Sequence, residues 1–251
     1  MLSEKLKELL IKSVKNCINE KNVAIAFSGG LDSSVIAKIA KKYFKASLYV
    51  VGTKGCLDIE SAKFAAKTLK LKLEIIEINK KDIESAIPEL IKINGCKNPV
   101  FISFTLPFYF VAKNCKEKIL ISGQGPDELF GGYAKYLKGY AQKEMKKDLE
   151  NLKLTIEKQR KIANHFEKEL KLPYLDKEIV DFAIKIPIKY KIHGEVRKYI
   201  LIQVAKQIGL PKEIAERKKK AAQYGSGAMK EIKKLAKERN LNVNEYIFRL
   251  V

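Results

Sequence analysis

The feature that most constrains this chain is a glycine-bearing segment over residues 27–34, which runs Phe-Ser-Gly-Gly-Leu-Asp-Ser-Ser. An apolar run over 23–27 is typical of a buried strand, and residues 35–40 are predicted to form a helix. A Ser-Gly-Gly turn between a strand and a helix leaves backbone N–H groups free at a helix N-terminus, a geometry that binds phosphate. Two adjacent glycines also let a large anion approach the backbone closely. The alternative is an ordinary tight turn in which Asp32 and Ser33 cap the helix.

Two carboxylates next to glycine-rich turns predict a metal site. Asp32 follows the first turn, and a carboxylate in a phosphate site indicates a bound Mg²⁺ ion. A second glycine-rich turn, over residues 121–133, contains Asp127. If the strands before these turns are neighbours in a parallel sheet, both turns leave its carboxyl edge, and the two aspartates can share one Mg²⁺. A helix start, which favours acidic residues, is the alternative explanation for Asp127.

Strand and helix patterns alternate over the first half of the chain. The predicted strands cover residues 22–27, 46–51, 71–78 and 118–122. Alternation of this kind favours an α/β fold, in which helices cover a parallel sheet. From about residue 134 onward the patterns are mostly helical, with helices predicted over 135–164, 176–184, 196–208 and 228–239. We therefore expect an N-terminal helix over 1–20 and one domain over 21–251, with a helical C-terminal part.

A basic segment near the C-terminus is a third candidate for ligand binding. It runs from Arg217 through three lysines to the Gly-Ser-Gly of residues 225–227. A mobile basic loop of this kind can close on phosphates and stabilise the charge of a transition state. A solvated basic loop with no ligand is the alternative.

The charge balance is strongly basic, because 50 Lys and Arg against 29 Asp and Glu give a formal charge of +21 over 251 residues. A thermophile-like composition, rich in Lys and Glu, is one explanation, and a nucleic-acid partner such as tRNA is another. The four cysteines lack metal-site spacing and are expected in the core. No apolar run approaches the ~20 residues that span a bilayer. The charged first residues are not signal-like, so we expect a cytoplasmic protein with no membrane partner.

Six motifs in the same order resemble the synthetase part of glutamine-dependent asparagine synthetases and of β-lactam synthetase, which are PP-loop ATP pyrophosphatases. The motifs lie at residues 28–34, 51–52, 122–133, 172–176, 198–201 and 217–219. The resemblance implies a Rossmann-like parallel sheet of the adenine nucleotide alpha hydrolase-like, PP-loop type. It also implies a ligase that adenylates a carboxylate with ATP, releases pyrophosphate, and forms an amide with ammonia or an amine.

The resemblance assigns the ATP-binding residues by motif. The pyrophosphate end of ATP is expected to lie against Ser28, Gly29, Gly30, Asp32, Ser33 and Ser34. The backbones of Ala26 and Val51 are expected to meet the adenine. Ser122 and Gly123 are expected beside the ribose and the α-phosphate.

The resemblance also implies residues for the chemistry. Asp32 and Asp127 are expected to ligate Mg²⁺, while Lys198 and Lys219 are expected to neutralise the leaving pyrophosphate. A metal and two ammonium groups would offset the charge that adenylation concentrates at the α-phosphorus. This chain has Gln124 at the position where the family has a glutamate beside the reacting carbonyl. A carboxamide can hydrogen-bond there but cannot accept a proton as a carboxylate does.

A second departure from the family concerns the nitrogen source. Asparagine synthetases have an N-terminal glutaminase domain with a cysteine after the initiator methionine, whereas this sequence has Leu2 at that place. We therefore expect free ammonia, a separate glutaminase subunit or a substrate amine as the donor. Two other functions remain open: a PP-loop tRNA-modifying enzyme that adenylates a base carbonyl for nitrogen or sulfur insertion, and an inactive nucleotide-binding or subunit-interaction protein.

Overall fold

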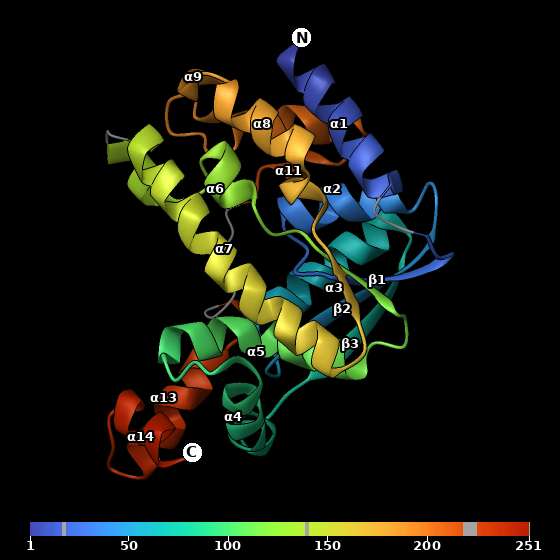
Figure 1. Ribbon diagram of the computed structural model, residues 1–251. Helices are drawn as coiled ribbons and strands as arrows, with labels where there is room; N and C mark the ends of the chain where they lie inside the picture. The colour runs from blue at the N-terminus through green and yellow to red at the C-terminus, as the bar shows by residue number, and fades with distance from the viewer. Residues whose placement is uncertain (17–18, 139–140, 218–224, 251) are drawn as a thin grey trace.

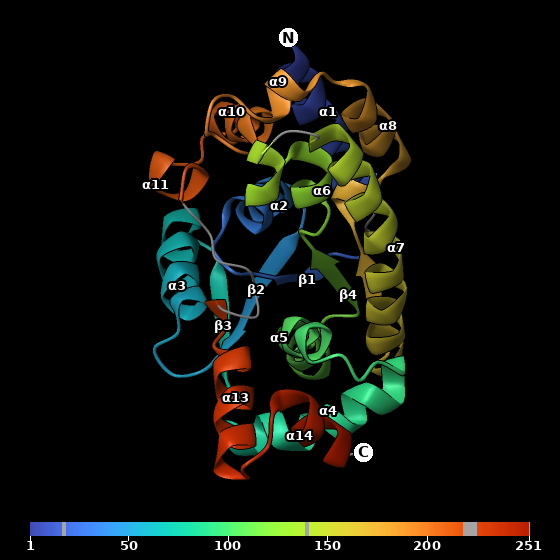
Figure 2. The ribbon, with the colours of Figure 1, turned by 90° about the vertical axis from the view of Figure 1, so that its left-hand side faces the viewer.

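The computed structural model describes residues 1–16, 19–138, 141–217 and 225–250. Five parallel strands form a sheet in the order β3-β2-β1-β4-β5, with helices on both faces (Figure 1 and Figure 2). The strands are β1 (Asn22–Ala26), β2 (Lys45–Gly52), β3 (Lys72–Glu77), β4 (Ile119–Ser122) and β5 (Glu169–Lys171). The fold is therefore a three-layer α/β arrangement with a parallel sheet in the middle.

The central strand β1 shows why the sheet is buried on both sides. Val23 and Ile25 pack into the core on one face, Ala24 packs into the core on the other, and all three are fully buried. A strand covered by helices on both faces must be apolar at nearly every position. At its end, Ala26 pairs in register with Tyr49 of β2 and Ser122 of β4.

Helices from both halves of the chain cover the first face of the sheet. They are α1 (Leu2–Asn16), α2 (Leu31–Ala40), α3 (Leu57–Leu69), α8 (Lys177–Lys185), α10 (Tyr199–Gln207) and α11 (Lys212–Ala215). The amphipathic α1 packs against α2, α8 and α10, and Leu6, Leu10 and Val14 on its apolar face are fully buried. The N-terminal helix thus joins the same core as the late helices.

The second face is covered by a different set of helices (Figure 2). They are α4 (Lys80–Asn94), α5 (Pro99–Asn114), α7 (Ala141–His165), α13 (Ala228–Glu238) and α14 (Val243–Arg249). α7 packs against α4, α5 and β5. Short elements complete the described chain: α6 (Pro126–Phe130), η1 (Ala134–Lys138), η2 (Pro173–Leu175) and α9 (Ile188–Lys191).

The structure confirms the predicted fold class and the four predicted strands, with shifts of at most one residue at their ends. It adds β5, which the sequence did not predict because the strand has three residues and only Leu170 is buried. The helix predicted over 196–208 was placed too early. It begins at Tyr199, because residues 193 and 196 form an antiparallel bridge and Lys198 is left-handed.

Two further expectations concern cysteines and membranes. Cys56 and Cys115 are buried and free, as expected of core residues, and Cys96 is half-buried and free. Within the described residues, no cluster of three or more His, Cys, Asp or Glu side chains is arranged to hold a metal. Among the helices of the described chain, none is both long and apolar enough to cross a bilayer.

Candidate active site

The strand order places the two glycine-rich corners side by side. Because β2 and β3 lie on one side of β1 and β4 lies on the other, the crossover direction changes between β1 and β4. Open α/β sheets bind ligands at the carboxyl ends of strands at such a switch point. The segment after β1 and the segment after β4 both start at this edge, and Ala26 and Ser122 are register partners there.

The first corner runs from Ser28 to the start of α2. Gly29 has a φ of +66°, and a Cβ on it would lie 2.4 Å from the backbone oxygen of Ser61 in α3. This glycine is therefore required by the turn and by the packing of α3, whatever binds outside. Gly30 is the residue before α2, and Ser33 Oγ donates to its carbonyl oxygen at 3.3 Å. Gly29 and Gly30 are buried behind the cavity wall, which Ser28, Asp32 and Ser33 help to form.

The second corner touches the first. A Cβ on Gly123 would lie 3.2 Å from the backbone nitrogen of Ser33, so the loop after β4 rests directly on the first turn of α2. The close approach explains a glycine at this position, because a side chain would push the two corners apart. The two predicted phosphate-binding segments, 90 residues apart in the chain, therefore share one site.

The Leu-Pro-Tyr-Leu-Asp segment over residues 172–176 contacts both corners. Tyr174 is fully buried, and its hydroxyl donates to the backbone oxygen of Asp32 at 3.0 Å. Leu175 fills the space beside Gly125, where a Cβ would come within 2.7 Å of the leucine side chain. Asp176 caps α8 by accepting from the backbone nitrogen of Glu178 at 2.9 Å. This motif positions the site without lining it.

Asp32, Asp127 and Lys198 form the charged centre of the site. The Lys198 ammonium lies 2.8 and 2.7 Å from the two carboxylate oxygens of Asp32 and 2.7 Å from an oxygen of Asp127. The side chains of Lys198 and Asp32 are only 11% and 7% exposed. Gly132 leaves room for this pair, because a Cβ there would overlap the Asp127 carboxylate and the end of the Lys198 side chain.

The backbone and the charge state of Lys198 both fit this bridging position. Lys198 precedes α10 with a φ of +54°, an uncommon conformation for a residue with a side chain. Burial lowers the pKa of its ammonium, but attraction by Asp32 and Asp127 outweighs burial and leaves the pKa above its ordinary value. The lysine is therefore a permanent cation between two carboxylates.

The two carboxylates fit a magnesium ion as a donor set. Both carboxylates reach one position for a cation, and the Lys198 ammonium occupies that position here. Mg²⁺ is commonly held by one or two carboxylates together with phosphate oxygens and waters. Asp32 and Asp127 would supply the protein part of such a shell, and a bound polyphosphate would supply the rest.

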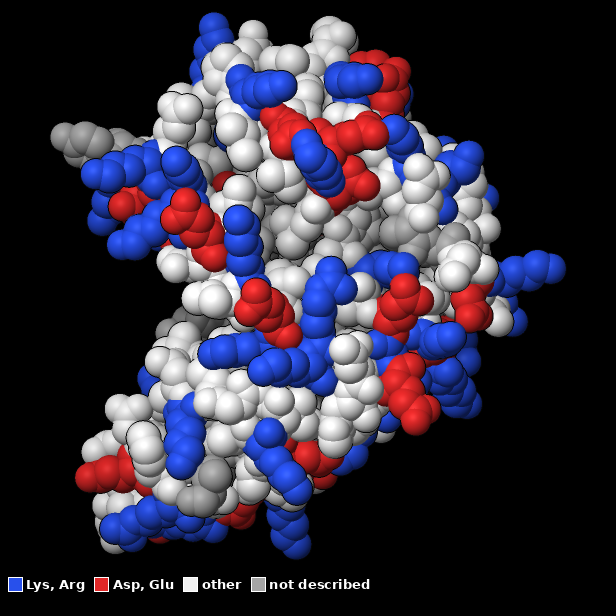
Figure 3. Space-filling view, viewed as in Figure 1, with Lys and Arg blue, Asp and Glu red and all other residues white. Residues whose placement is uncertain are grey.

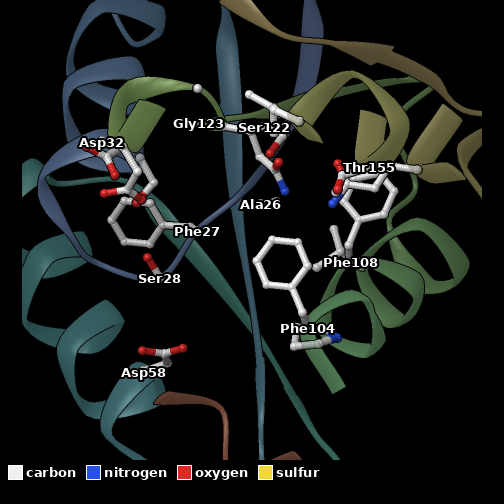
Figure 4. A pocket seen from close by; sticks show the side chains of 18 of the residues that line it. Ala26, Phe27, Ser28, Asp32, Asp58, Phe104, Phe108, Ser122, Gly123 and Thr155 are labelled. Carbon is white, nitrogen blue, oxygen red and sulfur yellow. The ribbon is translucent and has the colours of Figure 1, made fainter. Parts of the chain in front are cut away.

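A cavity of ≈ 600 Å³ opens beside this centre at the ends of β1, β2 and β4. It has two ends, which lie on opposite sides of the strand ends Ala26 and Ser122 (Figure 4). The α2 end is formed by Phe27, Ser28, Asp32, Ser33 and Asp127. The α7 end is formed by Phe104 and Phe108 of α5 and by Asp148, Asn151, Leu152, Thr155 and Gln159 of α7.

The remaining predicted nucleotide residues line the same cavity or lie behind it. Ala26 is the last residue of β1, and Val51 is the last but one of β2. Both line the cavity, as do Ser122 and Gly123. Ser34 is fully buried, and its hydroxyl oxygen has no hydrogen-bond partner. Gln124 is half-buried in the cavity wall.

The basic segment is described only at its ends. Lys219 lies outside the described residues. Arg217 donates to the backbone oxygen of Ser28 at 3.5 Å, and the backbone oxygen of Ser226 accepts from Thr53 at 2.9 Å. A Cβ on Gly225 would lie 2.3 Å from the carboxylate of Asp58, which lines the cavity. Both described ends of the segment therefore adjoin the first corner and the cavity.

Glu128 and Tyr133 form a hydrogen-bonded pair in the cavity wall, in which Glu128 is buried and Tyr133 is exposed. The Tyr133 hydroxyl donates to Glu128 at 2.7 Å. Burial raises the pKa of Glu128 to about 7, although the hydrogen bond from Tyr133 lowers it in part. Glu128 is thus a carboxyl group with a pKa near neutrality, on the short helix α6 that follows β4.

The sequence did not predict the α7 end of the cavity. Its polar lining on α7 is spaced three, seven and eleven residues from Asp148, which is one face of a helix. In the sequence, these residues are surrounded by the many charged residues of a 25-residue helix, so they do not stand out. A search for uncharged polar residues at helical spacing within that charged segment is the signal that would have found them.

Basic side chains do not gather in one patch on the face shown in Figure 3, where they are interspersed with acidic ones. Nothing in this distribution singles out a nucleic-acid surface. The tRNA prediction, which was based on the strong positive charge of the chain, stays a prediction.

Comparison with known sequences gives one family. The family model described as asparagine synthase matches residues 5–170 and 141–244. A Methanocaldococcus jannaschii protein named "Putative asparagine synthetase (glutamine-hydrolyzing) 1" is 36% identical over 295 aligned positions, covering 97% of this chain and 54% of that protein. Asparagine synthetase B (glutamine-hydrolyzing) of Escherichia coli is 27% identical, covering 88% of this chain and 45% of its own length. The chain thus spans about half the length of these relatives.

Solved structures give more distant likenesses. An NMN synthetase from Francisella tularensis aligns over 99% of this chain and 84% of its own, with 14% identity and a TM-score of 0.47. An NH3-dependent NAD synthetase from Campylobacter jejuni aligns over 74% of this chain and 96% of its own, with 21% identity and a TM-score of 0.34.

Proposed function

The chain belongs to the asparagine synthase family, and from this premise we propose that it is an ATP-dependent ligase that forms AMP and pyrophosphate. In the first step, an oxygen of a carboxylate substrate attacks the α-phosphorus of ATP, and the bond to pyrophosphate breaks. In the second step, ammonia or an amine attacks the acyl carbon of the adenylate. AMP then leaves, one proton is lost from the nitrogen, and an amide forms.

One observation supports this proposal most strongly: two carboxylates and a lysine converge beside a glycine turn at the strand edge. Adenylation moves negative charge onto the bridging oxygen of the leaving pyrophosphate, and fixed cations in a water-poor site stabilise that charge. We propose that Asp32 and Asp127 hold the Mg²⁺ that accompanies ATP, and that Lys198 neutralises the pyrophosphate. A bound Mg²⁺ would supply charge neutralisation at the phosphates.

The parts of the ATP molecule can be assigned to residues along the strand ends. We propose that Ser28, Ser33 and Ser34 and the backbone of the first corner bind the phosphates. The unpartnered hydroxyl of Ser34 supports this assignment, because a buried hydroxyl is seldom left without a hydrogen bond. The ends of β1 and β2, at Ala26 and Val51, are then the adenine side. Ser122 and Gly123, at the end of β4 on the other side of β1 from Val51, are assigned to the ribose and the α-phosphate.

Gln124 limits how the nitrogen nucleophile can be activated. It lines the cavity, but its carboxamide cannot take up a proton. We therefore propose that the nitrogen arrives uncharged, as ammonia or as the free base of an amine. A glutaminase on a separate chain is one source of such ammonia, and a cytoplasmic location agrees with it.

The test is to follow isotope and product together. Protein, ATP and Mg²⁺ are incubated with a panel of carboxylic acids labelled with ¹⁸O in the carboxylate, with ammonium chloride or glutamine as nitrogen donor. We expect AMP and pyrophosphate in equal amounts, no ADP, and transfer of one ¹⁸O to AMP. ATP hydrolysis to ADP, or AMP without ¹⁸O, would contradict the proposed carboxylate adenylation.

The same assay separates the alternatives. Turnover that requires added tRNA instead of an acid would support base modification. ATP binding without turnover under every condition would support a catalytically inactive nucleotide-binding protein. Turnover with ammonium but not with glutamine would indicate that nitrogen release is performed elsewhere.

A further inference from the structure

The α7 end of the cavity is built from one helical face. Asp148, Asn151, Thr155 and Gln159 line it from α7, and Phe104 faces them from α5. Figure 4 shows Thr155, Phe104 and Phe108 on the side of the cavity away from Asp32 and Ser28. If the α2 end holds the triphosphate, this end is left for the second substrate.

Gln159 is the most informative residue of this end. Its side chain is 1% exposed, and its Oε1 atom has no hydrogen-bond partner. Buried polar side-chain atoms are nearly always hydrogen-bonded, so an unpartnered acceptor in a cavity wall points to a donor on a ligand. That donor is a hydroxyl or an N–H group, since a carboxylate or an ether oxygen has no hydrogen to give.

The charges of the α7 end disfavour a ligand with a second carboxylate. Lys135 is the cation of its described lining, and its ammonium lies 2.6 Å from Asp148 and 3.4 Å from Glu144. Asp148 also accepts a hydrogen bond from the Tyr136 hydroxyl at 2.5 Å. An incoming carboxylate would therefore meet a lysine that two acids already neutralise, with the carboxyl of Glu128 in the same wall.

The rest of this end is apolar or uncharged. Phe104, Phe108 and Leu152 present hydrocarbon surface, and Asn151 and Thr155 present neutral polar groups. Such a lining stabilises an apolar or aromatic body by removing its surface from water.

We infer that the α7 end binds the acceptor acid, and that this acid is a monocarboxylate with an uncharged, largely apolar body whose hydroxyl or N–H donates to Gln159. The inference rests on the proposed function, and it distinguishes this chain from an enzyme that uses aspartate. Gln159 is a specificity-determining residue in this arrangement, and Asp32 and Lys198 remain the groups that act on the phosphates.

The test uses ATP–pyrophosphate exchange, which reports adenylation without a nitrogen donor. The full chain is assayed with four acids: 3-hydroxyphenylacetate, 4-hydroxyphenylacetate, phenylacetate and aspartate. We expect kcat/KM for at least one hydroxylated acid to exceed that for phenylacetate and that for aspartate by tenfold or more. Sites built to bind a hydroxyl discriminate strongly against the analogue that lacks it.

Two variants locate the discrimination. Gln159→Met keeps the side-chain length but removes the acceptor, and we expect the hydroxyl preference to fall to less than threefold. Gln207→Leu is the matched control, because Gln207 is exposed on α10 and donates to Ser3 far from the cavity. Thermal unfolding of each variant is followed by circular dichroism, and Thr155→Val provides a second lining change if Gln159→Met does not fold.

The outcomes are separable. Exchange with aspartate faster than with every neutral acid, or a hydroxyl preference that survives both lining changes, would overturn the inference while the ligase stands. Absence of exchange with all four acids and with every acid of the ¹⁸O panel would overturn the proposed function itself. A hydroxyl preference that is lost in Gln159→Met and kept in Gln207→Leu supports the inference.

Discussion

The two ends of the cavity differ in how their polar groups are satisfied. At the α2 end, both carboxylates have an ionic partner inside the protein, since Lys198 contacts both Asp32 and Asp127. At the α7 end, the charged pair Lys135–Asp148 is likewise matched, but the neutral Gln159 acceptor has no partner. The protein therefore holds the charged end ready by internal ion pairs, and it leaves the neutral end open for recognition.

This difference follows from the sizes of two free-energy costs, that of an unpaired buried charge and that of an unpaired neutral acceptor. An unpaired charge in a nearly buried site is far more unfavourable than an unpaired carbonyl oxygen, so a folded chain cannot leave the charged end unmatched. An unsatisfied neutral acceptor is destabilising by only about 1–3 kcal/mol, which a folded protein can tolerate at a binding site.

Removing the shared cation should have the largest effect. Lys198→Ala leaves Asp32 and Asp127 facing each other, and loss of one partner of a buried ion pair is destabilising by about 3–5 kcal/mol. We expect a matching fall in the free energy of unfolding in urea, measured in metal-free buffer. Added Mg²⁺ should restore part of the loss, because the two carboxylates would then have a cation.

The control for that change is Lys177→Ala, which removes an exposed lysine paired with Asp181. Exposed pairs contribute about 0–1 kcal/mol, so its unfolding curve should barely move. Equal destabilisation by the two substitutions would mean that the Lys198 bridge has no special role.

Neutralising one carboxylate should affect activity more than stability. Asp32→Asn keeps the shape of the side chain but weakens the site for Mg²⁺ and for the lysine. We expect pyrophosphate formation to fall by about 10²–10³-fold, the usual effect of losing one electrostatic group in a transition state. Asp181→Asn on α8 serves as the comparison, and wild-type rates in Asp32→Asn would remove the metal assignment.

The pH dependence of stability should report the buried Glu128. Its pKa is raised by burial from a usual 4.5 to about 7, so folding favours the protonated form. The contribution of Glu128 to stability should therefore be complete below about pH 4.5, fall as the pH rises to about 7, and then level off, a change of at most on the order of 3 kcal/mol. The difference in the free energy of unfolding between wild type and Glu128→Gln, measured by urea titration in metal-free buffer, should follow this slope.

Glu195→Gln in the exposed 193–196 turn is the control for the pH experiment and should keep the slope. A difference between wild type and Glu128→Gln that does not change with pH would contradict the raised pKa of Glu128.

Substitution of two glycines with nearly the same φ angle should distinguish the effect of backbone strain from the effect of close packing. Gly29 has a φ of +66° with the backbone of α3 within 2.4 Å of a Cβ, whereas Gly95 has a φ of +70° with nothing within 4 Å. Gly95→Ala should lower the free energy of unfolding by about 1 kcal/mol from left-handed strain alone. Gly29→Ala should lower it by roughly 2 kcal/mol more, measured by urea denaturation. Equal losses would show that α3 moves aside freely.

The smallest change is expected at the α7 end. Without substrate, Gln159→Met removes a buried acceptor that has no partner, and the free energy of unfolding should rise by about 1 kcal/mol. A destabilised variant would indicate that Gln159 already has a satisfied structural role. A gain in stability together with a loss of acid selectivity would confirm that this end gives up stability for recognition.

The sequence was informative where a short segment determines its own geometry. Turns rich in glycine beside apolar strands predicted both corners, and the parallel order of β1 and β4 brings Asp32 and Asp127 to the same lysine, Lys198. That the two aspartates share a Mg²⁺ ion stays a prediction. Lys198 was assigned to the site through a motif, but its bridge between both carboxylates depends on the packing of α10 against α2 and α6. Sequence reasoning cannot place such a contact.

The α7 end was not predictable for a different reason. Thr155 and Gln159 are chemically ordinary residues in a charged helix. They line the cavity only because α7 packs against α5 and β5. The strand β5 was itself missed, since three residues with one buried side chain give almost no periodic signal. The helix face and the short edge strand are fixed by tertiary contacts, which no local pattern records.

The lysine between the two aspartates has a consequence for the order in which ligands arrive. A free magnesium ion would have to displace the ammonium group from both carboxylates, so the bare metal should associate weakly. A nucleotide that brings its own magnesium also offers phosphate oxygens to the displaced lysine. Metal and triphosphate should therefore enter this protein together, as one complex, and not one after the other.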